Sequence, residues 1–226
     1  MSEKHNSPQL ETTVVGSYPA RIGIGSILSQ FYFKKDPGTD AIRYAVEKQK
    51  EAGINIISDG QVRKDMISIV ASCCHGINAG PRPKIIGEIK RKCLIIKNDL
   101  EFIGTMTDGK TKVKGILTGP YTISRNCTNS YYKNDDEVAW AFVDALKEEI
   151  HDLKNQVHMI QIDEPFLSVE YFEPIGDMIR ELTKDVRIPV ALHVCGDVRP
   201  IFTSLLDLRI EFSTLNLWRI HTTSNP

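Results

Sequence analysis

The chain has 226 residues, of which 41% are hydrophobic and 25% charged, and its formal net charge is -1 at pH 7. This composition predicts a globular protein with one substantial core. The balanced charge argues against nucleic-acid binding, and the sequence has no apolar run long enough for a membrane span. Met1 to His5 lead into no apolar signal segment, so we expect a cytoplasmic protein.

Five cysteines are spread over the chain: Cys73, Cys74, Cys93, Cys127 and Cys195. An odd number without a secretion signal predicts reduced thiols rather than a disulfide framework. The group Cys73-Cys74-His75 suggests a metal cluster, but vicinal cysteines have poor geometry for chelation. We therefore interpret that group as structural.

The first part of the chain alternates strand-like and helix-like segments. Residues 12–19 are β-branched and then broken by glycine and proline, which predicts a strand that ends in a loop. Asp40 is the expected cap of a helix that runs to Gly53. Residues 54–60 predict a second strand, and residues 61–72 predict the helix after it.

The middle of the chain departs from this alternation. Residues 81–108 contain two short β-prone pieces, 84–89 and 93–96, separated by a charged turn. We interpret this segment as a hairpin-like insertion. The alternation then returns, with a strand predicted over 112–120 and a long amphipathic helix over 135–155.

Three further strands complete the pattern. Residues 158–165 predict a strand that ends in acids, residues 190–195 predict a buried strand, and a sixth strand is expected between 210 and 217, with helices predicted over 172–185 and 199–208. Repeated strand-helix units predict a parallel sheet, either doubly wound or closed as a (β/α)8 barrel. Polar or glycine residues end five strands, and a barrel gathers such ends into one ring, so we favour the barrel. The first strand precedes no Gly-x-Gly-x-x-Gly loop that would indicate a nucleotide fold.

The buried strand carries the strongest chemical signal. His193 and Cys195 are two residues apart, so on a strand their side chains point the same way and can bind one metal ion. Imidazole and thiolate are both good zinc ligands. An isolated His-x-Cys pair is more often part of the core than of a metal site. The choice between these two interpretations therefore depends on the surrounding motifs.

Five motifs in register resemble the catalytic domain of cobalamin-independent methionine synthases, especially the short single-barrel forms of archaea and some bacteria. They are Thr13 to Pro19, Asp59 to Met66, Leu117 to Pro120, Gln161 to Pro165 and Leu192 to Gly196. The resemblance implies a (β/α)8 barrel and a methyltransferase that converts homocysteine to methionine. It also implies a Zn2+ ion that binds the homocysteine thiol, and a methyl donor that is either a methylated corrinoid protein or methyltetrahydrofolate.

The same resemblance assigns roles to individual residues. His193 and Cys195 would bind zinc, and Asp163 would pair with the substrate ammonium group. Gly16 and Ser17 would contact the amino acid, and Gln61 falls near a position where the long forms carry a substrate-binding Glu. Structural alternatives remain, because Gly16 could be only a turn residue and the acids after residue 162 could mark only a helix N-terminus.

The C-terminal segment departs from the family pattern. The family has a third zinc ligand, a Glu, after the next strand and a fourth, a Cys, near the last strand, whereas residues 215–221 contain no acid. Glu211 would lie at the wrong end of its strand, and His221 is a substitute ligand at best. A barrel takes about 250 residues. We therefore expect one domain over 1–226 with about six strands, as a truncated or evolved short form with an atypical tail over 218–226.

Unpaired strand edges favour association, so a homodimer is expected. Two other functions stay open: a sister activity among uroporphyrinogen decarboxylases and corrinoid thiol methyltransferases, or a truncated, non-catalytic remnant. The Gly16-Ser17-Tyr18-Pro19 and Asp163-Glu164-Pro165 motifs favour homocysteine over the sister activities.

Overall fold

The computed structural model describes residues 11–19, 36–109, 111–208 and 212–215, the last four through their backbone only. Its main sheet has five strands in the order β1-β4-β6-β7-β8, and every neighbouring pair is parallel. The strands are β1 (Ile56–Ile57), β4 (Lys112–Thr118), β6 (Met159–Asp163), β7 (Val190–Val194) and β8 (Phe212–Leu215). Thr13 adds a parallel bridge to Ile56 at the β1 edge, which gives six strand positions in chain order.

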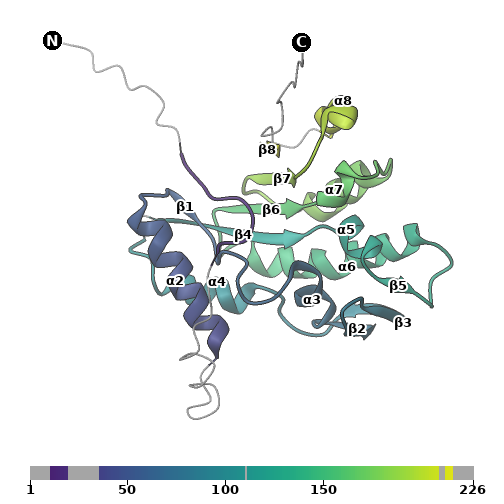
Figure 1. The fold of residues 1–226 in the computed structure, drawn as a ribbon, viewed down its shortest axis with the longest axis horizontal. Coiled ribbons are helices and arrows are strands. Elements are labelled where there is room, and N and C mark those ends of the chain that lie inside the picture. The colour runs from purple at the N-terminus through teal and green to yellow at the C-terminus, as the bar shows by residue number, and fades with distance from the viewer. Residues whose placement is uncertain (1–10, 20–35, 110, 209–211, 216–226) are drawn as a thin grey trace, which may run out of the picture.

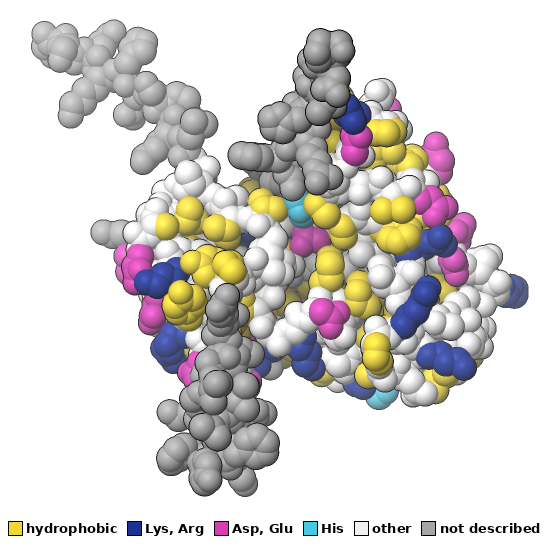
Figure 2. Space-filling view, viewed as in Figure 1, with side chains coloured by type: hydrophobic (Ala, Val, Ile, Leu, Met, Phe, Trp, Pro, Cys, Tyr) yellow, Lys and Arg dark blue, Asp and Glu magenta, His cyan; other side chains and the backbone are white. Residues whose placement is uncertain are grey.

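Helices connect and cover these strands (Figure 1). They are α2 (Pro37–Glu51), α3 (Met66–Ala71), α4 (Lys97–Gly104), α5 (Pro120–Arg125), α6 (Asp135–Leu153), α7 (Ile175–Thr183) and α8 (Phe202–Leu206), with short 3-10 turns η1 (Pro165–Ser168) and η2 (Arg199–Ile201). Parallel strands in chain order with crossover helices are the arrangement of a barrel-type α/β fold. No described helix combines the length and hydrophobicity that a membrane span needs. Lys and Arg side chains are interspersed with Asp and Glu side chains on the face in Figure 2.

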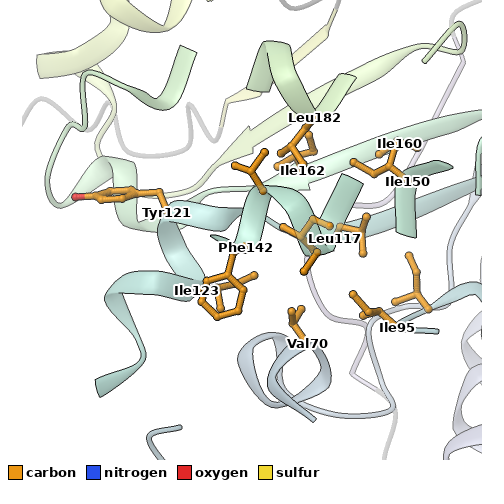
Figure 3. Packing of buried hydrophobic residues seen from close by; sticks show 14 of the residues in the cluster. Val70, Ile95, Leu117, Tyr121, Ile123, Phe142, Ile150, Ile160, Ile162 and Leu182 are labelled. Carbon is orange, nitrogen blue, oxygen red and sulfur yellow. The ribbon is translucent and has the colours of Figure 1, made fainter. Parts of the chain in front are cut away.

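The two faces of the main sheet differ in chemistry because successive residues of a strand point to opposite sides. One face packs on the helices and forms the core, through Val113, Leu117, Ile160, Ile162, Leu192 and Val194. Phe142 and Ile150 of α6 and Leu182 of α7 belong to the same core, as Figure 3 shows. The opposite face carries polar side chains, including Lys114, Gln161, Asp163 and His193, and all four are buried. The chemistry of the fold is therefore concentrated on the face turned away from the helices.

The inserted hairpin differs from its predicted position. β2 (Cys74–Asn78) pairs antiparallel with β3 (Lys84–Arg91), and β3 pairs parallel with β5 (Thr128–Asn129). The prediction that residues 93–96 form the second strand is wrong, because the partner of β3 precedes it in the chain. Gly76 has a positive φ of 74°, and a Cβ there would collide with the backbone of β3, so glycine permits this close approach.

Two local predictions are also corrected. Helix α2 begins at Pro37 rather than Asp40, because Asp36 accepts a hydrogen bond from the Gly38 backbone and proline suits the first helical turn. Cys73 and Cys93 form a disulfide with Cα atoms 5.0 Å apart, so the prediction of reduced thiols is wrong for this pair. The fold brings the end of α3 to the segment after β3, a proximity that cysteine spacing does not reveal. Free thiols among the described residues include Cys74, Cys127 and Cys195.

Candidate active site

The carboxyl ends of β4, β6 and β7 bring three polar residues side by side. Thr118 pairs in register with Asp163, and Asp163 pairs in register with His193. Neighbouring strands lie about 4.8 Å apart, so paired side chains on one face are within reach of one another. Asp163 is 4% exposed and His193 is 7% exposed. The structure thus brings together two of the residues that the motifs single out.

Asp163 is held by two side-chain amides, one on each carboxylate oxygen. Gln161 Nε2 donates to Oδ1 at 2.6 Å, and Gln61 Nε2 donates to Oδ2 at 3.0 Å. Burial raises the pKa of Asp163, while the Gln161 hydrogen bond, the charge interaction with His193 and the Gln61 hydrogen bond act in the opposite direction. The carboxylate is therefore oriented by the protein and positioned to interact with a cation.

Gln61 reaches Asp163 from the loop after β1. Its backbone φ is +50°, a value that is uncommon for residues other than glycine. The direction of the Gln61 side chain therefore depends on an unusual local backbone conformation. The preceding Gly60 accepts a hydrogen bond from the Tyr18 backbone at 2.7 Å. This contact places the N-terminal loop with Gly16 and Ser17 against the Gln61 loop. Gly16 has a φ of 78°, which accords with its interpretation as a turn residue.

Lys114 is part of the site although it lies outside the five sequence motifs. Its side chain is fully buried, and Nζ donates to Gln161 Oε1 and to the Val14 carbonyl oxygen, each at 2.7 Å. Burial lowers the pKa of Lys114 to about 8, against the opposing effect of the Asp163 charge. The sequence signal was a lysine inside a β-prone run, but Lys112 and Lys114 at alternate positions resemble the solvated face of a strand.

Glu164 belongs to the scaffold of the site. Its Oε1 accepts a hydrogen bond from the Tyr121 backbone at 3.0 Å, and its Oε2 accepts one from Thr122 at 2.7 Å. Glu164 therefore caps α5, the helix after the neighbouring strand, rather than the 3-10 turn that follows it in sequence. Burial raises the pKa of Glu164 to about 7, against the opposing effect of these hydrogen bonds.

The expected metal ligands lie at the end of β7. His193 lies within the strand, whereas Cys195 immediately follows the strand and is half-buried. The prediction that both residues lie on the strand is therefore wrong for Cys195, by one residue. An imidazole and a thiol so close in the chain have the donor chemistry of a zinc site. Within the described part of the chain, no three His, Cys, Asp or Glu side chains gather around a common point. Glu211, His221 and the tail over 218–226 lie outside the described residues.

The chain is similar to proteins of one family over most of its length. A family model for the catalytic domain of cobalamin-independent synthase matches residues 10–224. The methionine synthase of Methanocaldococcus jannaschii is 34% identical over 88% of this chain and 68% of its own length. That of Methanothermobacter thermautotrophicus is 35% identical over 88% of this chain and 70% of its own length.

Two solved structures share the fold. A B12-independent methionine synthase from Shewanella sp. W3-18-1, in complex with selenomethionine, superposes with a TM-score of 0.70 at 22% identity, over 88% of this chain and 65% of its own. A putative vitamin-B12 independent methionine synthase from Listeria monocytogenes gives a TM-score of 0.71 at 22% identity, over 90% of this chain and 73% of its own. With the parallel strand order, these similarities confirm the predicted barrel-type α/β fold, of which the described residues supply six strand positions.

Proposed function

The chain belongs to the family of cobalamin-independent synthase catalytic domains, as its motifs predict, and from this premise we propose that it transfers a methyl group to homocysteine to form methionine. The observation that supports this function best is the buried Asp163 carboxylate, which two amides orient beside His193 at the carboxyl end of the sheet. An amino-acid substrate brings an ammonium group that such a carboxylate can bind. Active sites of barrel folds lie at this end of the strands.

Each residue has a role in the proposal. Asp163 binds the substrate ammonium group and Gln61 orients that carboxylate, while Gly16 and Ser17 contact the amino acid from the adjoining loop. His193 and Cys195 would hold a Zn2+ ion, which lowers the pKa of a bound thiol and so supplies a thiolate nucleophile. Burial of the Asp163 carboxylate limits the competition of water for the ammonium contact.

The methyl donor in this proposal is a methylated corrinoid protein or methyltetrahydrofolate. A cytoplasmic location and a homodimer are further parts of the proposal. Light scattering during size-exclusion chromatography tests the dimer, and a mass equal to one chain contradicts it.

The decisive experiment is methionine formation by the purified protein, assayed separately with methylcobalamin and with methyltetrahydrofolate, with the zinc content measured on the same sample. We expect methionine from homocysteine with one of the two donors. Asp163→Asn should weaken homocysteine binding by about 10- to 150-fold, because a hydrogen bond to a charged group contributes about 1.5–3 kcal/mol. The exposed Asp177→Asn is the matched control and should bind as the wild type does. No methionine with either donor contradicts the proposal.

A further inference from the structure

Lys114, Gln161 and Asp163 form a buried polar chain on the inner face of the sheet. Gln161 and Asp163 are two residues apart on β6, so their side chains share one face. Gln161 pairs in register with Ile116 of β4, which places Lys114 on the same face. Lys114 and Gln161 are 0% exposed. Solvent therefore does not compete with the hydrogen bonds that connect the three residues.

The chemistry of these groups allows only one orientation of the Gln161 amide. The Lys114 ammonium group has donors and no acceptor, so the amide oxygen has to face it. On the other side, Asp163 Oδ1 accepts a hydrogen bond from the amide NH2 at 2.6 Å, so the NH2 faces the carboxyl group. In a flipped amide, the NH2 group would face the Lys114 ammonium group and the amide oxygen would face the Asp163 carboxyl oxygen. Lys114 thus determines which group Gln161 presents to Asp163, although Lys114 does not touch the carboxylate.

The same ammonium group also holds the N-terminal loop. Lys114 Nζ donates to the carbonyl oxygen of Val14, two residues before Gly16. One side chain therefore connects the loop that carries Gly16 and Ser17 to the strand that carries Asp163. A buried ammonium is unfavourable compared with an apolar side chain of similar size, so core stability alone does not account for a lysine here.

We infer that Lys114 and Gln161 are positioning residues that hold the Asp163 carboxylate, and the N-terminal loop to which Lys114 is hydrogen-bonded, in the geometry that selects an α-amino thiol over a thiol without an amino group. This inference rests on the proposed function of Asp163. The arrangement makes selectivity for the ammonium group depend on two residues that do not contact the substrate.

The test compares homocysteine with 4-mercaptobutanoate, which has the same thiol, carbon chain and carboxylate but no amino group. Isothermal titration of the full-length wild-type protein and of Lys114→Met gives the affinity for each ligand. We expect the wild type to prefer homocysteine. In Lys114→Met that preference should fall by about tenfold or more, with little change for the des-amino ligand. In an Asp163→Asn background, Lys114→Met should have no further effect on the preference.

The outcomes separate this inference from the function on which it rests. A wild type that binds both ligands equally, or neither, overturns both. A wild type that prefers homocysteine beside a Lys114→Met variant with the same preference overturns this inference alone, as does an equal loss of affinity for both ligands. If Lys114→Met does not fold, as judged by circular dichroism, Gln161→Met replaces it, because that change leaves the Lys114 contact to Val14 in place. Gln161→Met should show the same loss of preference.

Discussion

Replacing Gly119 with alanine should destabilise the protein through a single displaced side chain. Gly119 has an ordinary backbone conformation (φ -76°, ψ 158°), so alanine introduces no backbone strain there. A Cβ at this position would lie under 3.0 Å from three atoms of the Glu164 side chain. Glu164 is fully buried and cannot move into solvent. It therefore has to leave its cap on α5, and the backbone N–H groups of Tyr121 and Thr122 lose their acceptors.

The size of the effect follows from those two hydrogen bonds. Each buried donor left without a partner costs about 1–3 kcal/mol, so Gly119→Ala should lower the unfolding free energy by about 4 kcal/mol. For a domain of this size, this corresponds to a fall in Tm of about 12 °C. Urea unfolding followed by circular dichroism measures the free energy directly, and thermal unfolding measures the shift in Tm.

Gly104→Ala is the matched control. Gly104 ends α4, and a Cβ there meets no atom within 4 Å, so alanine should leave the stability unchanged or raise it by up to about 1 kcal/mol. In a Glu164→Ala background the obstructing carboxylate is gone, and Gly119→Ala should then cost little. A Gly119→Ala protein as stable as the wild type would refute the reasoning, as would an equal loss in both backgrounds.

Three further predictions concern other buried groups. Burial raises the pKa of Asp59 to about 6 from its ordinary value of 3.8, so the native state retains a proton that the unfolded chain loses. Asp59 should therefore contribute a fall of about 3 kcal/mol in the unfolding free energy as the pH rises from about 4 to 6. In urea unfolding at several pH values, Asp59→Asn should reduce the total fall by that amount and leave the part that comes from Glu164. Arg91→Met should cost about 3 kcal/mol in urea unfolding because it leaves the fully buried Glu149 without its cation, whereas the exposed Lys90→Met should change the stability by less than 0.5 kcal/mol. Phe142→Ala should cost about 3–5 kcal/mol in the same assay, and a smaller loss would show that the core around α6 closes the cavity.

The regular part of the fold could be predicted from local patterns. β4 (Lys112–Thr118) and α6 (Asp135–Leu153) match their predicted segments to within two residues at each end, because apolar periodicity and an Asn134 cap are encoded locally. The hairpin partner of β3 could not be predicted in this way. β2 contains Cys74, His75 and Gly76, which lack the alternation of a strand, and its place depends on a close approach that only the folded chain reveals.

The candidate site shows the same division. Asp163 and His193 could be selected because their residue types, strand-end positions and family motifs agree. Lys114 could not be separated from a solvated lysine, since its burial depends on the Val14 segment and on β6, both distant in sequence. The capping role of Glu164 was likewise hidden, because the helix it caps begins 44 residues earlier at Pro120. The sequence thus selects candidate groups, whereas tertiary contacts determine how those groups are held.

The chain-order arrangement of the main sheet has a consequence for biosynthesis. During translation, each strand of the sheet leaves the ribosome after the neighbour on which it will pair: β4 after β1, β6 after β4, β7 after β6 and β8 after β7. The nascent sheet can therefore grow by addition at one edge, and none of these strands has to be inserted between two that are already joined. Codon changes that slow elongation after β6 should then leave a partly formed sheet with β6 as its exposed edge, which limited proteolysis of stalled nascent chains can detect.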